Sequence, residues 1–115
     1  MAAQYISITG LRLKKWWHWP LFWRHALASM VQARRSEGNI SAEARQIDGV
    51  HHTLTVWRDR KAMLAFVHSA SHAKAIAVFS RIATGKTHGY LSDSVPDWAE
   101  IPAIWHEKGR EYLPR

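Results

Sequence analysis

Hydrophobic and polar side chains alternate in three stretches of the chain, as they do in strands that bury one face. In the first, residues 4–13, β-branched and aromatic residues such as Ile8 are separated by small or polar ones. In the other two, residues 40–45 and 50–57, the alternation is regular, and Asp48-Gly49 between them is typical of tight hairpin turns. We therefore predict a strand over residues 4–13 and an antiparallel hairpin formed by residues 40–45 and 50–57. A shorter fourth strand is predicted over 87–92.

Apolar residues recur every three or four positions in three other stretches, which predicts helices there. The first stretch covers residues 21–36 and follows Pro20, a residue that suits the first turn of a helix. The second covers residues 59–82, and Ser69 and Ser71 lie where that helix could divide into two pieces. The third is a short C-terminal helix. Its one-turn neighbours are Trp98, Ile101 and Trp105, and it ends at Gly109.

The order of these elements, βαββαβ with a C-terminal helix, is that of the ferredoxin-like fold. We therefore predict a single α+β domain over residues 1–115, with helices on one face of a four-stranded antiparallel sheet. The other face has enough apolar area to favour burial against a second subunit. The predicted assembly is a homodimer in the form of a dimeric α+β barrel.

Composition narrows the classes of function. The 115 residues are 47% hydrophobic and 22% charged, which indicates a globular chain, and the absence of cysteine excludes disulfides, thiolate metal sites and a cysteine nucleophile. It also fits a cytoplasmic location, and neither a signal peptide nor a membrane span is evident. The net charge is +7, and six basic residues precede the first acid, Glu37. No nucleic-acid-binding motif accompanies them, so no nucleic-acid partner is expected.

One passage resembles a known superfamily. The stretch from His52 to Phe66, HTLTVWRDRKAMLAF, followed by Ser71-His72, resembles the strand-to-helix passage of antibiotic-biosynthesis-monooxygenase-like domains. The closer likeness is to small uncharacterised members and to spheroidene monooxygenase-like proteins. The resemblance implies a homodimer with two sheets packed face to face and a small apolar pocket between sheet and helices. The superfamily includes cofactor-free oxygenases, haem-binding enzymes and members without catalytic activity. The resemblance maps the axial histidine of the haem-binding members onto His72, or less well onto His68.

Histidines are the main candidates for chemistry. His68 and His72 are four residues apart, so an unbroken helix would place both imidazoles on one side, close enough to share a metal or bracket a substrate. Two ligands do not make a metal site, and no metal site is predicted. A third ligand would have to come from His25, His51, His52 or His88. Because His51 and His52 are adjacent on a strand, just one of them can face a given pocket, where it could act as a general base.

Tryptophan is concentrated near the first helix. Trp16, Trp17, Trp19 and Trp23 are interleaved with basic residues, and such a cluster could stack a planar ligand, bind nucleic-acid bases, lie at a membrane interface, or cap a barrel mouth or dimer interface. Trp57, Trp98 and Trp105 are predicted to be core residues.

The sequence thus predicts an oxygenase-like enzyme acting on a planar apolar small molecule in a pocket between the sheet and the helices. The expected catalytic residues are His72 and His52, and the expected ligand-binding residues are Trp23, Trp57, His68, Thr53 and Phe66. No cofactor is expected, with haem on His72 as the alternative. The second hypothesis is a non-catalytic dimeric module that binds a small molecule, a partner protein or an anionic surface through its basic, tryptophan-rich end. If the partner is a protein or an anionic surface, this hypothesis predicts that side chains fill the space between sheet and helices.

Overall fold

The computed structural model describes residues 3–111, with residues 70 and 71 described by their backbone alone. The predicted domain extends over 1–115, so its first two and last four residues lie outside the described part. The elements are β1 (Gln4–Leu13), η1 (Trp16–His18), α1 (Trp19–Arg35), β2 (Asn39–Ile47), β3 (Val50–Trp57), α2 (Arg60–Val67), α3 (Ala70–Ile82), β4 (Ala83–Ser92), η2 (Trp98–Glu100), α4 (Ile101–Lys108) and β5 (Arg110–Glu111).

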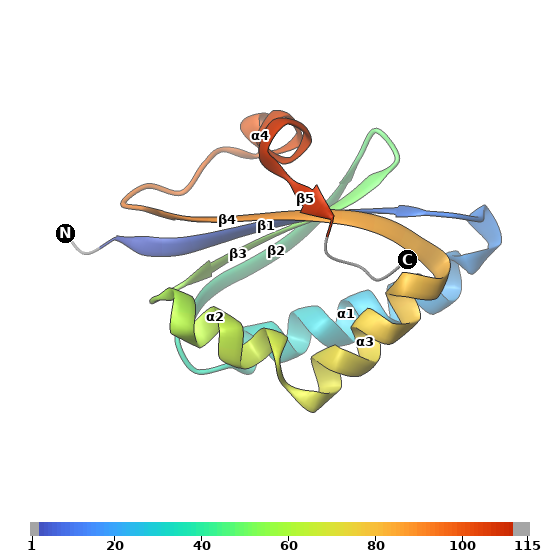
Figure 1. The fold of residues 1–115 in the computed structure, drawn as a ribbon, viewed down its shortest axis with the longest axis horizontal. Helices are drawn as coiled ribbons and strands as arrows, with labels where there is room; N and C mark the ends of the chain where they lie inside the picture. Colours follow the sequence, from blue (N-terminus) through green and yellow to red (C-terminus); the bar gives the residue numbers. More distant parts are fainter. Residues whose placement is uncertain (1–2, 112–115) are drawn as a thin grey trace.

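The sheet has the strand order β2-β3-β1-β4-β5, and its neighbouring strands are antiparallel. The first four strands form the predicted ferredoxin-like arrangement. β1 lies at its centre, where Ile8 pairs with Leu54 on one side and with His88 on the other. Helices α1, α2 and α3 cover one face, and α4 lies across the other (Figure 1). The α+β fold class is confirmed.

Two boundaries differ from the sequence prediction. β4 begins at Ala83, not near Thr87, because the segment that follows α3 pairs directly with the end of β1, Ala83 opposite Leu13. The sheet has five strands and not four, since Arg110 pairs with Thr87 in the two-residue β5. Such a short strand leaves no periodicity in a sequence from which it could be predicted.

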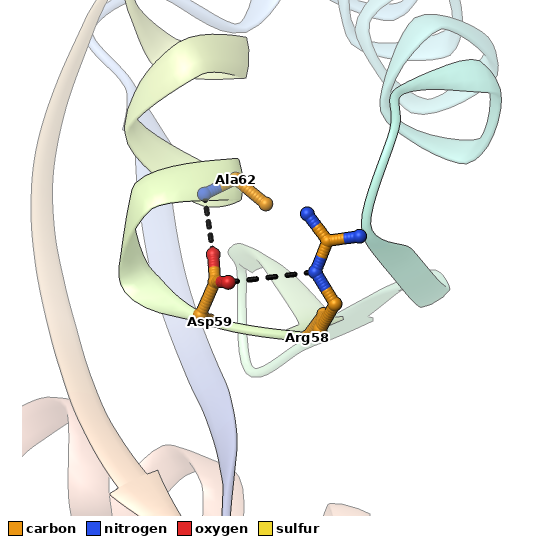
Figure 2. Close-up of polar contacts among 3 residues, drawn as sticks. All are labelled: Arg58, Asp59 and Ala62. Atoms are coloured by element: carbon orange, nitrogen blue, oxygen red, sulfur yellow. Dashed lines mark hydrogen bonds and ion pairs between the residues drawn. The ribbon is translucent and has the colours of Figure 1, made fainter.

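The long second helix is divided, as the serine in its middle indicated. α2 ends at Val67, and Ser69 begins α3 as its N-cap, with its hydroxyl accepting a hydrogen bond from the His72 backbone N–H at 3.3 Å. The start of α2 is capped in the same way: the Asp59 carboxylate accepts from the Ala62 N–H at 2.8 Å and pairs with Arg58 (Figure 2).

The sheet face opposite α1–α3 is covered from within the chain. Ile6, Ile8, Leu54 and Val56 on this face pack against α4, where Ile101 is fully buried. Trp105 belongs to this cluster, Trp98 packs at its edge, and Trp57 is fully buried in a second cluster on the helix-covered face. The apolar face that favoured a partner subunit therefore finds cover in α4. The homodimer stays a prediction.

In the part of the chain that the structure describes, no single helix is long and apolar enough to cross a membrane. Only α2 and α3 taken together reach the required length and composition, and they are bent by 70° at their junction.

Candidate functional site

A cavity of about 290 Å³ lies between the sheet and helices α1, α2 and α3. Its floor comes from alternate residues of three neighbouring strands, since side chains on one face of a strand recur every second position. These floor residues are Tyr5, Ser7, Thr9, Leu11, His51, Thr53, Thr55, Trp57, Thr87 and Gly89. The roof consists mainly of apolar side chains, among them Phe22, Trp23, Ala26, Leu27, Met30, Met63, Phe66, Val67, Ile76 and Phe79, together with His72.

Hydroxyl groups occupy the middle of the floor. Thr9 and Thr53 are directly opposite each other on β1 and β3, and their hydroxyls are hydrogen-bonded. The Thr55 hydroxyl accepts from the Trp57 indole N–H at 2.9 Å, and the Thr87 hydroxyl donates to the Ile8 carbonyl at 3.2 Å. The four threonine hydroxyls of the floor are thus hydrogen-bonded within the protein. These bonds hold the hydroxyls in fixed positions beneath an apolar roof.

His51 lies at one end of the cavity, between aromatic rings of α1. Its imidazole is 4.4 Å from the Phe22 ring centroid and 5.5 Å from that of Trp23. Its Nδ1 atom is buried and has no hydrogen-bond partner among the described residues. Burial, and secondarily the neighbouring His52, lower the pKa of His51 below its usual value, so the imidazole is held in its neutral form.

His72 lies at the other end. Its ring is 4.5 Å from that of Phe66, which in turn stacks on Trp57 at 5.4 Å. The Nδ1 atom of His72 is also buried without a partner in the described part of the chain, and desolvation lowers its pKa. Two turns of α3, about 10 Å, separate His72 from Phe79, whose ring contacts Phe22 beside His51. The cavity is therefore lined by two imidazoles with lowered pKa values, His51 beside Phe22 and His72 beside Phe66.

The structure separates the predicted site residues into three groups. Trp23, Trp57, Thr53, Phe66 and His72 line the cavity, and their binding and catalytic roles stay predictions.

His52 borders the cavity only where its strand forms the floor, and its ring is on the other face of the sheet. There its Nδ1–H donates to the Thr9 carbonyl at 3.2 Å, and the ring meets Trp105 of α4 edge to face, 5.0 Å between centroids. The alternation of β3 explains this placement, since His52 shares a face with Leu54 and Val56. The histidine of this pair that faces the cavity is His51.

His68 does not line the cavity. It is the exposed C-cap of α2, and the break at Ser69 separates it from His72. His68 and His72 therefore do not lie on one side of a continuous helix, which their action as a pair would require. Among the residues that the structure describes, no three histidine or acidic side chains lie close enough together to hold a metal ion.

The lining offers little to haem. Arg45 is the one arginine or lysine in it to meet two propionates, and His72, its histidine on the helix side, has its ring packed on Phe66. The volume of about 290 Å³ lies just below the ~300–1,000 Å³ typical of small-molecule sites.

The sequence prediction chose His52 over His51 as the histidine that faces the cavity, and it did not include the hydroxyls of Ser7, Thr9, Thr55 and Thr87 in the site. A signal for His51 was present, because the alternation that places Thr53 and Trp57 on one face of β3 places His51 there too. The hydroxyls of β1 and β4 had no such signal. They become a group only when three strands, far apart along the chain, are brought side by side in register.

Several solved structures share this fold at low sequence identity. A conserved protein of unknown function from Bacteroides thetaiotaomicron, suggested to be an oxidoreductase, matches with a TM-score of 0.72 and 13% identity over 80% of this chain and 100% of its own. SnoaB, a cofactor-independent oxygenase from Streptomyces nogalater, matches with a TM-score of 0.70 and 11% identity over 84% and 100%. A candidate antibiotic biosynthesis monooxygenase from Nitrosomonas europaea matches with 0.70 and 14% over 82% and 92%. No protein-family model and no curated protein matches the sequence.

The fold is therefore that of the antibiotic-biosynthesis-monooxygenase-like proteins, which confirms the fold that the resemblance of residues 52–72 implied. The likeness is one of fold, and the chemistry of the cavity rests on this chain's own side chains.

Proposed function

We propose that the protein is a cofactor-independent oxygenase-like enzyme for a planar, apolar phenol or enol bound in the cavity between the sheet and the helices. The observation that carries the proposal is the pair of half-buried imidazoles, His51 and His72, that line one mainly apolar cavity. The hydroxyl of a ligand in this cavity can form a hydrogen bond with a neutral imidazole.

In the proposed reaction the neutral His72 imidazole removes the hydroxyl proton of the substrate, and His51 positions a polar group at the far end. The phenolate transfers one electron to O₂, and the resulting radicals combine to form a C–O bond at a ring carbon. The imidazolium returns its proton to the peroxide. Loss of the ring C–H proton and of hydroxide from the O–O bond then leaves a quinone and one molecule of water. The substrate supplies all four electrons, so the overall change is phenol plus O₂ to quinone plus water.

The surroundings suit this chemistry. Burial keeps the pKa of His72 low, so that the imidazole stays unprotonated below the pH at which an exposed histidine becomes charged. The apolar roof excludes water, which would protonate the carbanion-like ring carbon or quench the radical pair. A hydrogen-bonded floor can hold the substrate plane without competing for the proton that His72 removes.

The test is oxygen consumption and quinone formation with a panel of polycyclic phenols. His72→Gln is expected to reduce turnover by about 10²–10⁴, the usual contribution of a general base, while His51→Gln is expected mainly to raise KM. His68→Gln is the matched control, because His68 is exposed and lies outside the cavity lining. With ¹⁸O₂, one labelled atom should enter the product.

Ala26→Phe, which fills the cavity from α1, should abolish binding of these phenols. Unchanged oxygen consumption in a His51→Gln/His72→Gln double variant would contradict the proposal. Added haemin should give no Soret band that depends on His72.

The alternative, a non-catalytic module, predicted side chains filling the space between sheet and helices. The open, histidine-lined cavity supports the enzyme over that alternative. If phenols bind with cavity-dependent affinity but no oxygen is consumed with any of them, a non-catalytic binding protein becomes the better description.

A further inference from the structure

The solvent-facing side of α1 carries an apolar stripe that the cavity does not explain. Trp16, Trp19, Trp23, Leu27 and Val31 follow one another at intervals of three or four residues, so they lie along one side of η1 and α1. We call them the tryptophan stripe. Trp16 is 76% exposed, Trp19 54%, Leu27 58% and Val31 45%, whereas Trp23 is half-buried against His51. Large apolar side chains exposed in a row indicate a surface that meets something other than water.

The charge around the stripe has one sign. The first 36 residues contain no acid, and their basic residues are Arg12, Lys14, Lys15, Arg24, Arg34 and Arg35. Lys15 and Arg24 are exposed, and the Lys15 ammonium lies 5.7 Å from the centre of the exposed Trp17 ring. The first acid along the chain is Glu37, after the end of α1. A binding partner for this surface is therefore expected to be anionic.

The stripe also passes the opening of the cavity. Arg34 donates from its guanidinium to the Ala42 carbonyl at 2.8 and 3.1 Å, which holds this side of α1 beside the edge strand β2. Two turns earlier on α1, Leu27 lines the cavity together with Ala44 and Arg45 of β2, and all three are exposed. Leu27 thus belongs both to the tryptophan stripe and to the cavity mouth, which makes the apolar surface continuous from outside to inside.

We propose that the tryptophan stripe binds the surface of an anionic membrane and that the cavity takes its planar apolar ligand from the lipid; the second part rests on the proposed function. Tryptophan favours the boundary between hydrocarbon and water, and each basic residue near an anionic lipid surface adds attraction. A ligand that is sparingly soluble in water concentrates in the same lipid. With the stripe seated in the interface, the mouth at Leu27 opens toward that reservoir.

Charge argues for lipid over a second copy of this chain. A symmetric dimer through the stripe would bring two segments of six basic residues each face to face, which Coulomb repulsion opposes. An anionic lipid surface meets the same segment with opposite charge. The lipid surface also accommodates the exposed indoles together with the flanking cations. A partner bound by charge alone would need the cations but not the indoles.

The test is co-sedimentation of the full chain with vesicles of phosphatidylcholine, with and without phosphatidylglycerol. Binding is expected with the anionic vesicles only, and added salt should weaken it. A Trp16→Ser/Trp19→Ser variant and a Lys15→Glu/Arg24→Glu variant should each weaken it at least tenfold. Both change exposed side chains, so circular dichroism should show unaltered folding.

Matched controls exist away from the stripe. Leu91→Ser/Val95→Ser removes two exposed apolar side chains, one near the end of β4 and one in the segment after it. Arg60→Glu/Lys61→Glu reverses the charge at the start of α2, at the opposite end of the sheet from η1 (Figure 1). Neither control should change vesicle binding by more than about twofold. Equal loss in controls and stripe variants would overturn the proposal, as would binding to single-stranded DNA but not to vesicles, or a self-association that the stripe variants abolish.

Vesicle binding needs no substrate, so its outcome is independent of catalysis. A chain that binds anionic vesicles through the stripe but consumes no oxygen with any phenol would refute the proposed function and leave the membrane surface standing. A chain that turns over phenols equally well with and without vesicles, and does not sediment with them, would refute the membrane surface and leave the proposed function standing.

Discussion

At the scale of single residues, the buried imidazoles of His51 and His72 are the unusual feature of this protein. Each keeps a ring nitrogen away from water with no hydrogen-bond partner in the described chain, although a buried polar group without a partner costs about 1–3 kcal/mol. His52, in contrast, has its Nδ1–H bonded to the Thr9 carbonyl and serves the packing of α4. Both imidazoles line the same cavity, and this is the reason to regard them as ligand-binding groups.

We expect His72→Phe to raise the free energy of unfolding by about 1 kcal/mol at neutral pH, since the ring keeps its contact with Phe66 and the unmet nitrogen is removed. The pH dependence should change as well. Because burial lowers the pKa of His72 in the folded state, the unfolded chain takes up its proton first, and stability is lost as the pH falls through about 6.5, the unfolded value, until the folded value is reached. The variant should lose less stability between pH 7 and 5.

Thermal unfolding across this pH range measures both effects. The comparison must be with wild type over the same range, because His51, His52 and His88 also have lowered pKa values and contribute slopes of the same sign. A variant that is less stable than wild type and equally sensitive to acid would show that His72 has a hydrogen-bonded structural role.

At the scale of elements, helix starts decide where the site residues lie. Asp59 begins α2 and Ser69 begins α3, and the turn between these helices places His72 over the cavity while His68 remains exposed. A continuous helix would have kept the two histidines on one side. The cap residues therefore control the composition of the site as well as local stability.

Asp59→Ala is expected to lower the melting temperature at neutral pH, because the Ala62 N–H loses its acceptor, whereas Asp59→Asn should retain most of the stability (Figure 2). The hydrogen bond from the Ala62 backbone lowers the pKa of Asp59 in the folded state. Its contribution is thus present above the unfolded value of 3.8 and is lost as the pH falls through the folded value. The difference between wild type and Asp59→Ala should narrow in strong acid, and a constant difference would contradict the capping role.

At the scale of the whole molecule, the two faces of the sheet are covered differently. The face under α1–α3 leaves a cavity, and the face under α4 is filled: Trp105 packs against Gly10, where any added Cβ would overlap the indole. The Trp105 indole N–H also donates to the Lys86 carbonyl at 3.0 Å. α4 thus closes a surface that would otherwise have to be buried against another chain.

Ile101→Ala should lower the free energy of unfolding by about 2–4 kcal/mol, since Ile101 is fully buried between α4 and the sheet. Gly10→Val should displace Trp105 and expose the sheet face, seen as increased binding of a hydrophobic dye and as self-association in light scattering. Ile104→Ala, at a partly buried position of the same helix, is the milder comparison. If Gly10→Val remains as compact and as monodisperse as wild type, α4 is not what covers this face.

The sequence determined the elements and their order because those depend on local patterns. Alternation over 50–57, the Asp48-Gly49 turn with both residues at positive φ, and the cap residue types each act within a few positions. The capped break at Ser69 was also visible. β5 was not, because two residues carry no period, and its pairing with β4 depends on where α4 ends.

Only the tertiary structure decided the site. Which side of β3 becomes the cavity floor depends on the face that α1–α3 cover, and that choice selected His51 and removed His52 to the α4 side. The hydroxyls of Thr9, Thr53 and Thr87 meet because β1 lies between β3 and β4. Local sequence fixes conformation over a few residues, whereas a cavity is defined by contacts between segments up to about 80 residues apart along the chain, and those arise only when the sheet is assembled.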